Sequence, residues 1–385
     1  MTNAALRGKS DAGNPHVRFD EGEVAPAATP RRGSLLYNDT TFLYGALLHL
    51  GSNMWSDQPS PRPDNEKSRY PYPDYLKSDE LAAKKLAHRM SGDCDHMRFD
   101  EDVWRRATAR MAEIGMNFVL VDVGEGLAYP SHPELAVKGS WSPEKMAEEV
   151  ARLRSMGLEP SPKLNFSATH DTWLKEYGRM VSTPDYYRVV ADVIRDTAEI
   201  FKPRYFHVGY DEEDYLHQEH FRYAVMRQGD LWWTDFLFTV KEVERHGVRP
   251  WMWSDKIWHS REEFVRRCPK SVLCSNWYYL DNFDPKKASD LYPMVHAYEW
   301  LEEAGFDQVP CCSSCGNWST LDTNPLLTVE YCLPRIARER FKGLLTTSWQ
   351  MTLKPFERWV IRSLDLTIPA AKKLADAGML EARKL

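Results

Sequence analysis

Three consecutive acidic residues follow a short apolar run in the middle part of this 385-residue chain. The run, residues 205–209, ends in a glycine and is followed by Tyr210, Asp211, Glu212 and Glu213. Aromatic and β-branched residues in such a run predict a buried strand. Neighbouring carboxylates repel each other, so at least one is expected to have a raised pKa and to keep its proton near neutral pH. A protonated carboxyl group beside an ionised one can break glycosidic bonds, whereas the alternative interpretation is a solvated acidic turn.

Further residues with ionisable, amide or aromatic side chains lie at or just after the ends of the other predicted strands. Acids and histidines can exchange protons with a polar substrate, and indole faces pack against sugar rings, although tryptophan also fills ordinary cores. If the runs are parallel strands, their carboxyl ends share one rim and bring these side chains together. The residues are His49, Asn53, Trp55, Asp122, Glu125, Lys163, Asn165, His170, His207, Trp251, Trp253, Asp255, Trp258, Asn276, Trp277, Tyr279, Asp281, Trp349 and Gln350.

Eight runs of strand character alternate with amphipathic segments, and both kinds are needed to position this rim. The alternation predicts an α/β protein with one closed (β/α)8 (TIM) barrel rather than an open sheet. Ser142 and Thr183 each precede a proline, which predicts helix N-termini, and a capping box begins at Ser260. Strands are expected at residues 42–50, 117–123, 159–165, 205–209, 249–254, 272–277, 308–312 and 343–349. Helix ends are expected at Gly115, Gly157 and Gly247.

The domain organisation follows from composition. Residues 1–35 are rich in Ala, Pro, Gly and charge, which predicts a disordered tail. Residues 36–385 are then expected to form a single barrel domain. The alternation is interrupted by an insertion at residues 56–98, after the first strand, with a short helix expected near residues 78–90. A long loop at this rim is expected to shape the entrance to the site.

Bulk properties exclude several classes of partner. The net charge of −6 and the lack of a Lys/Arg block argue against nucleic acid. No apolar segment approaches the length of a membrane span or a signal-peptide core, so a cytoplasmic protein without membrane contact is expected. The seven cysteines lack framework spacing and favour thiols in a reducing compartment. The lone C-x-x-C of Cys312 and Cys315, preceded by Cys311, supports zinc only weakly, so no metal or other cofactor is expected. The sequence leaves open whether the chain forms a homo-oligomer.

The segment 207–212, His-Val-Gly-Tyr-Asp-Glu, resembles the H-x-G-G-D-E motif of glycoside hydrolase family 20, the β-N-acetylhexosaminidases. The similarity extends over residues 42–371. His170 falls where that family has the histidine of its P-G-H segment, the segment 279–281 matches its Y-L-D, and Trp349 matches its last-strand tryptophan.

This resemblance implies a carbohydrate substrate whose own 2-acetamido oxygen attacks the anomeric carbon. Glu212 would protonate the leaving oxygen and then activate water, while Asp211 would orient the acetamido N–H. Tyr279 would hydrogen-bond the acetamido oxygen. The other implied contacts are walls formed by Trp253, Trp277 and Trp349, a sugar hydroxyl held by Asp281, a supporting pair of His170 with Asp122, and His207 beneath the site.

Four positions depart from the family pattern. The first strand ends with His49 and no arginine, Tyr210 is expected to place a bulky side chain beside the acid pair, Lys163 replaces a glutamate, and Met351 replaces an acid. The acid pair is kept while the groups that read the far side of the sugar have changed. His49 and Lys163 could each bind substrate in place of the lost arginine or be buried groups with internal partners.

Three other interpretations stay open. A sugar without an acetamido group would require Asp211, Glu213, Asp122 or Asp255 to act as nucleophile or base. A metal-dependent barrel enzyme would use the histidines and acids as ligands, although no H-x-H or H-E-x-x-H spacing supports it. A non-catalytic barrel would bind a saccharide without cleaving it.

Overall fold

Eight parallel strands form the central sheet of the computed structural model, which describes residues 41–59, 78–284, 292–313 and 322–381. Their order in the sheet is β6-β5-β4-β3-β2-β1-β8-β7. The strands are β1 (Leu43–His49), β2 (Phe118–Asp122), β3 (Glu159–Lys163), β4 (Tyr205–His207), β5 (Arg249–Trp253), β6 (Leu273–Ser275), β7 (Cys311–Ser313) and β8 (Gly343–Thr347). Each overlaps one of the eight predicted runs, so the predicted strands are confirmed.

The two edge strands of this order, β6 and β7, close the sheet into a barrel. They are joined by isolated parallel bridges between Cys274 and Gln308 and between Trp277 and Cys311. The N–H of Cys311 donates to the carbonyl of Asn276 at 2.9 Å. The predicted (β/α)8 barrel is therefore confirmed.

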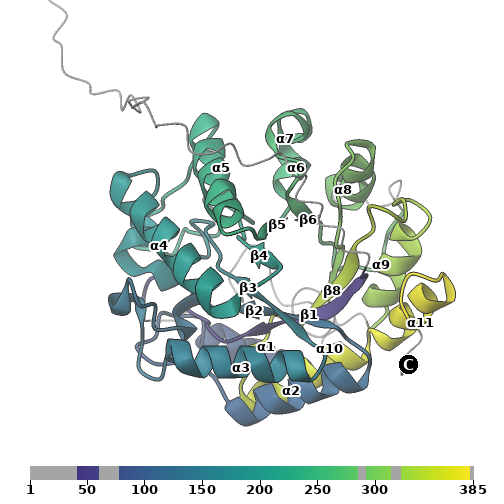
Figure 1. Cartoon of the computed structure of the whole chain (residues 1–385), viewed down its shortest axis with the longest axis horizontal. Coiled ribbons are helices and arrows are strands. Elements are labelled where there is room, and N and C mark those ends of the chain that lie inside the picture. Colours follow the sequence, from purple (N-terminus) through teal and green to yellow (C-terminus); the bar gives the residue numbers. More distant parts are fainter. Residues whose placement is uncertain (1–40, 60–77, 285–291, 314–321, 382–385) are drawn as a thin grey trace, which may run out of the picture. The chain divides into compact units, whose positions relative to one another are not determined.

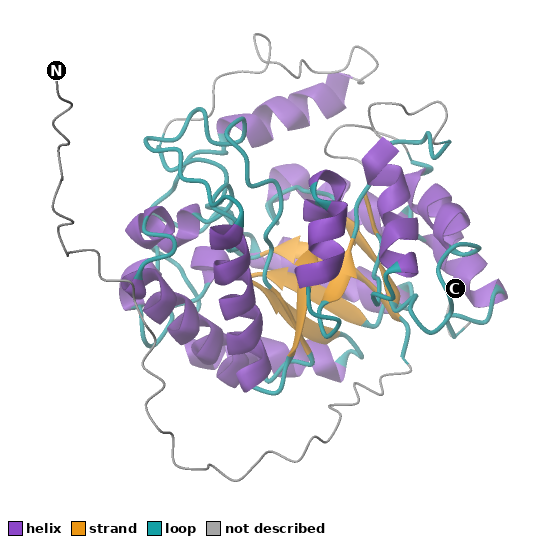
Figure 2. Ribbon diagram, turned by 90° about the horizontal axis from the view of Figure 1, so that it is seen from above, coloured by secondary structure: helices purple, strands orange, loops and turns teal. Residues whose placement is uncertain are grey.

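Helices cover the outside of the strands (Figures 1 and 2). The α-helices are α1 (Ser78–Arg89), α2 (Glu101–Glu113), α3 (Pro143–Ser155), α4 (Pro184–Phe201), α5 (Asp230–Arg245), α6 (Lys256–His259), α7 (Arg261–Arg267), α8 (Tyr292–Glu303), α9 (Asn324–Cys332), α10 (Glu357–Asp365) and α11 (Ile368–Asp376). Short 3-10 turns are η2 (Gly124–Gly126), η3 (Pro133–Leu135), η4 (Thr172–Arg179) and η6 (Lys354–Phe356). Within the described residues, no helix is long and apolar enough to cross a membrane.

The helix boundaries test the capping signals in the sequence. Ser142 accepts a hydrogen bond from the N–H of Lys145 and Thr183 from that of Tyr186, so both predicted N-caps are confirmed. The capping box at Ser260 is wrong, because this side chain makes no capping bond. Ser260 is the one residue between α6 and α7, and both helices constrain its backbone. The three glycines predicted at helix ends, Gly115, Gly157 and Gly247, have positive φ angles.

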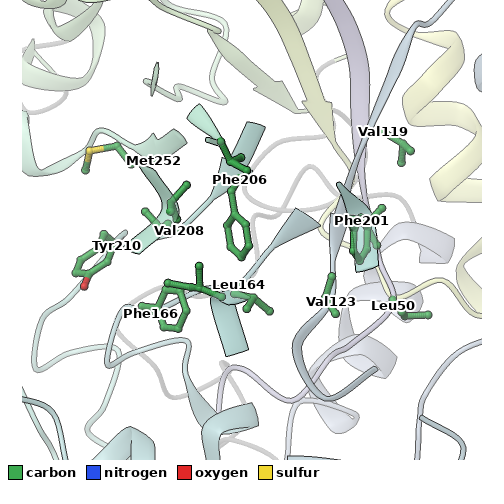
Figure 3. Packing of buried hydrophobic residues seen from close by; sticks show 14 of the residues in the cluster. Leu50, Val119, Val123, Leu164, Phe166, Phe201, Phe206, Val208, Tyr210 and Met252 are labelled. Carbon is green, nitrogen blue, oxygen red and sulfur yellow. The ribbon is translucent and has the colours of Figure 1, made fainter. Parts of the chain in front are cut away.

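Side chains alternate along the strands and fill two layers. Leu120 and Trp251 point into the barrel, whereas Phe206, Val208 and Met252 pack between the strands and the helices (Figure 3). Full burial of such a side chain contributes ~1.5–3 kcal/mol. Apolar side chains fill most of both layers, and buried polar groups such as Asp122, Lys163 and His207 lie at the carboxyl ends of the strands.

Residues Thr40–Leu385 form one compact unit. The tail predicted for residues 1–35, part of the insertion at residues 60–77, and Cys315 lie outside the described residues. The predicted helix of the insertion is confirmed as α1. Cys311 and Cys312 are buried in β7 and reach opposite layers, because successive strand residues face opposite sides.

Candidate active site

The turn after β4 holds the acid pair in an unusual backbone conformation. Gly209, Tyr210 and Glu212 all have positive φ, at 75°, 70° and 52°. A β-carbon at position 209 would lie 1.9 Å from Oδ1 of Asn165, so only glycine fits there. Positive φ is costly for the two larger residues, and such strain concentrates at functional sites.

Side chains from the segments that follow β3 and β5 hold this turn in place. Oδ1 of Asn165 accepts from the N–H of Tyr210 at 3.2 Å, and its Nδ2 donates to Oδ1 of Asp211 at 2.8 Å. The N–H of Glu212 donates to Oδ2 of Asp255 at 2.9 Å. The acid pair is therefore positioned by its neighbours on both sides.

Tyr210 does not lie beside the acid pair, contrary to the prediction from its size. Its ring packs against Trp232 and Phe236 of α5, and its hydroxyl lies 2.9 Å from Oγ1 of Thr239 (Figure 3). The Arg227 guanidinium lies 5.0 Å from the ring centroid. The side chain belongs to the layer outside the barrel, because the positive φ angles of Gly209 and Tyr210 turn it away from the rim.

His170 joins the two acids. Its Nε2 lies 3.3 Å from Oδ2 of Asp211 and 3.3 Å from Oε2 of Glu212, and its Nδ1 lies 2.9 Å from the carbonyl of Thr169. The side chain of Asp211 is 9% exposed and that of Glu212 is 28% exposed. Glu212 is thus the member of the pair that solvent and a substrate can reach more easily.

Burial raises the pKa of both acids, as their adjacency predicts. For Asp211, the charge of Lys163 and the Asn165 hydrogen bond oppose this rise in pKa. For Glu212, the Asp211 charge adds to the rise in pKa, while nearby histidines oppose it. Burial, reinforced by Asp211, also raises the pKa of Asp255. The site can therefore keep a proton on a carboxyl group at a pH where a solvated acid would lose it.

Asp122 does not pair with His170, contrary to the implied supporting pair. Its Oδ2 lies 2.8 Å from Nζ of Lys163 and 3.2 Å from Nδ1 of His49. Burial alone would raise the pKa of Asp122, but the charge of Lys163 and the contact with His49 lower it to about 2. Asp122 therefore forms a buried ion pair with Lys163 and also contacts His49. Lys163 and His49 thus both have a partner inside the protein.

His207, expected beneath the site, lies at the end of β4, where it is fully buried. Its Nδ1 accepts from the N–H of Gly209 at 3.1 Å, and its ring lies 4.5 Å from that of Trp253. Burial, with the charge of Lys163, moves the pKa of His207 well below its ordinary value. A neutral imidazole thus forms the floor under the acid pair.

Most other rim acids have structural partners. Glu213 forms a buried ion pair with Arg227 and also accepts from the N–H of Ala168, so it is not positioned as a nucleophile. Glu125 accepts from the N–H groups of Ser52 and Asn53. Among the carboxyl groups weighed as alternatives, Asp255 alone keeps a raised pKa next to the pair.

Aromatic residues at the ends of three strands, β5, β6 and β8, gather inside and beside the rim. Tyr279 is buried and stacks on Trp277, with ring centroids 5.1 Å apart. Trp349 lies 5.9 Å from Trp253, and both belong to the same cluster as Tyr279. Asp281 is exposed, and no contact described in the structure joins it to this group.

Two residues that sequence reasoning missed complete the surroundings of the acid pair. Nε2 of His217 lies 3.4 Å from Oε2 of Glu212, and Nδ1 of His217 lies 2.9 Å from both carboxylate oxygens of Asp214. The available signal was an acid and a histidine three residues apart, directly after the three acids.

A metal ion was also considered for this cluster. Ligand atoms of His170, Asp211 and Glu212 all lie within 4.8 Å of one another. The same spacing suits hydrogen bonds that share protons, and the raised carboxyl pKa values fit that arrangement. The three groups can therefore bind a polar substrate and move protons to and from it.

These features define a class: a (β/α)8 barrel with proton-transfer groups at the carboxyl ends of its strands, where such barrels carry their chemistry. No protein-family model and no curated protein matches the chain. Solved structures with the same fold include three β-N-acetylhexosaminidases, and the chain spans less than two thirds of the length of each.

The GH20 enzyme from Streptomyces coelicolor A3(2) is 15% identical with a TM-score of 0.52, covering 84% of this chain and 63% of the other. The Streptomyces plicatus enzyme, in complex with Thio-NAglucal, is 14% identical with a TM-score of 0.53 and the same coverages of 84% and 63%. The Bacteroides fragilis NCTC 9343 enzyme is 10% identical with a TM-score of 0.52, covering 84% and 65%. At these sequence identities the similarity shows a shared fold. The resemblance to family 20 seen in the sequence is therefore confirmed for the fold.

Proposed function

We propose that this chain is a glycoside hydrolase in which Glu212 is the general acid and base and Asp211 is its partner. One observation carries the proposal: Asp211 and Glu212 lie together after β4, with raised pKa values and with His170 bridging them. A carboxyl group that is protonated near neutral pH can protonate a glycosidic oxygen as that oxygen leaves.

The spacing of the acids bears on the mechanism. Their facing oxygens lie within 4.8 Å of each other, whereas inverting glycosidases need about 6.5–9.5 Å between carboxyl groups to hold a water molecule. An attack by the substrate's own 2-acetamido oxygen needs no such water in the first step. In that scheme Asp211 orients the acetamido N–H, and the sugar keeps its anomeric configuration.

Buried polar atoms near the acids support a substrate with many hydroxyl groups. Among the described residues, Nε1 of Trp253, Nε2 of His49, Nε2 of His207 and Oδ1 of Asp255 are buried without a hydrogen-bond partner. Buried polar groups in proteins are nearly always paired, so such a group of unpaired atoms favours a polar ligand. We propose that Tyr279, Trp277 and Trp349 line the same ligand.

The test is hydrolysis of aryl glycosides with and without a 2-acetamido group by the wild type, Glu212→Gln and a matched control. Glu219→Gln is the control, because Glu219 is an exposed glutamate on the same loop. We expect cleavage of acetamido sugars, at least a 100-fold loss in Glu212→Gln, little change in the control, and retention of configuration by NMR of the first product.

Other outcomes would change the proposal. Cleavage of plain hexosides would keep the hydrolase and remove substrate assistance, with Asp255 next to the pair as the candidate nucleophile. Saccharide binding that survives in Glu212→Gln, with no hydrolysis by the wild type, would indicate a binding barrel. Stoichiometric metal in the purified protein, with activity lost on chelation, would indicate a metal enzyme.

A further inference from the structure

The loop after the acid pair returns a histidine to Glu212. Asp214 fixes the ring of His217 through Nδ1 at 2.9 Å, and Nε2 of that ring lies 3.4 Å from Oε2 of Glu212. The side chain of His217 is 31% exposed, and that of Glu212 is 28% exposed. The mechanism above does not use this contact.

Both histidines at the site approach the same oxygen of Glu212. His170 reaches Oε2 from the loop after β3, and His217 reaches it from the loop after β4. Their rings lie 6.4 Å apart and nearly perpendicular. Two rings on one oxygen fix the plane of the carboxyl group, so the other oxygen, Oε1, can carry the proton that is transferred to a substrate.

The chemistry of the contact requires a proton between the two atoms. The Asp214 carboxylate accepts a hydrogen bond from Nδ1 of His217, so a neutral ring carries its proton on Nδ1. The same carboxylate also stabilises the charged imidazolium form of the ring. With Nδ1 protonated, only the charged ring carries a proton on Nε2; it donates this proton to Oε2 of Glu212, so that the acidic proton of Glu212 lies on Oε1. Within the described part of the chain, the charged or titratable groups around this proton include Asp214, His170, Asp211 and Asp255, the last through the N–H of Glu212.

We infer that Asp214 and His217 act as a pair that positions Glu212 for proton transfer to the leaving group. The inference rests on the proposed function, because it names a positioning device for the same acid. It predicts that losing the pair weakens acid catalysis and leaves sugar binding and the fold intact.

Two glycosides of the sugar found in the panel test the pair, one with a phenyl and one with a 2,4-dinitrophenyl leaving group. The nitrated phenolate departs without protonation, whereas phenol requires it. In His217→Gln and Asp214→Asn we expect kcat for the phenyl glycoside to fall roughly 10-fold or more, with KM and dinitrophenyl cleavage nearly unchanged. Equal losses on both substrates, or no loss on either, would overturn the inference.

The control is His296→Gln on α8. His296 also pairs through Nδ1 with a carboxylate three residues away, Glu299, and it lies on an outer helix. We expect this variant to keep wild-type rates on both substrates. Thermal unfolding of every variant checks the fold.

The pH dependence of kcat/KM is a further test, because a purely structural role of His217 would not change it. The charge of His217 lowers the pKa of Glu212. Its removal in His217→Gln therefore raises that pKa, keeps Glu212 protonated to higher pH and moves the basic limb of kcat/KM upward. A basic limb that stays in place or moves downward would contradict the pair.

A readout without turnover separates this inference from the proposed function. If the wild type cleaves no glycoside, the proposed function fails, and the contact is judged by ring-nitrogen NMR. Glu212→Gln is then expected to shift the Nε2 resonance of His217 and to leave that of His296 in place. An unchanged His217 resonance would overturn the contact itself.

Discussion

The partners of each buried carboxyl group at the rim decide when it holds a proton. Asp122 faces Lys163 and His49, and its pKa is lowered to about 2. Glu125 is bonded to two backbone N–H groups, which stabilise its charge less than burial destabilises it, and its pKa rises to about 7. Acids of equal intrinsic strength are thus kept ionised or protonated by what they touch.

Glu125 gives a prediction about stability. Its pKa of about 7 in the folded state lies above its ordinary value of 4.5, so between these values the folded protein keeps a proton that the unfolded chain releases. Stability therefore falls as the pH rises through this window. We expect Glu125→Gln to lack this loss, with a difference from wild type on the order of 2 kcal/mol between pH 4.5 and 8.

Urea unfolding at both pH values measures this difference. Any effect of the new amide in Glu125→Gln on stability that does not depend on pH cancels when the two pH values are compared for the same variant. Glu219→Gln serves as the control, because the side chain of Glu219 is exposed. The same pH dependence in Glu125→Gln and wild type would show that Glu125 is ionised in the fold.

At the scale of elements, β4 and the turn that follows it determine where the acids lie. β4 is only three residues long, and the backbone leaves it through consecutive positive φ angles at Gly209 and Tyr210. This path sends Tyr210 to the helix layer and Asp211 to the rim. Asn165 from the neighbouring strand end can bond the turn because residue 209 has no side chain.

Gly209→Ala tests this turn. The new methyl group would meet Asn165, which would release both the N–H of Tyr210 and the carboxylate of Asp211. Gly247→Ala is the matched control, because its φ of 71° is similar but no atom lies within 4 Å of the added carbon. We expect each variant to lose ~1–2 kcal/mol from backbone strain.

Only Gly209→Ala should then lose further stability and most of its hydrolytic activity. Chemical denaturation and hydrolysis rates of the two variants measure this. Equal effects in the two variants would show that Asn165 does not control the acid pair.

At the scale of the whole barrel, the seam between β6 and β7 lacks the continuous pairing found between β1 and β2. β1 and β2 pair over five residues on each strand, from Gly45 to His49 and from Phe118 to Asp122, whereas β6 and β7 are joined by isolated bridges and a few backbone hydrogen bonds. Backbone pairing of this kind limits local opening. The seam also lies next to Trp277 and Tyr279, so its opening would disturb the aromatic side of the site.

Hydrogen exchange followed by mass spectrometry tests the seam. We expect amides of residues 273–277 and 308–313 to exchange faster than those of residues 43–49 and 118–122. The reason is that fewer ladder bonds must break for the seam to open. Uniform protection around the barrel would contradict this view of the closure.

The sequence by itself determined the barrel and the place of the acid pair. Apolar runs separated by caps and glycines specify alternating strands and helices, and parallel strand ends must share one rim, so Asp211 and Glu212 could be located from local signals alone. Local signals failed at Ser260, where two helices meet, and they do not say which side chain faces which across the barrel.

Only the tertiary structure decided the partners. Asp122 meets Lys163 rather than His170, Tyr210 turns outward, and His217 returns to Glu212. Each of these depends on backbone angles and side-chain directions set by distant strands and loops. Because the electrostatic state of a buried acid depends on neighbours a few ångströms away, the chemistry of the site emerged only with the packed fold.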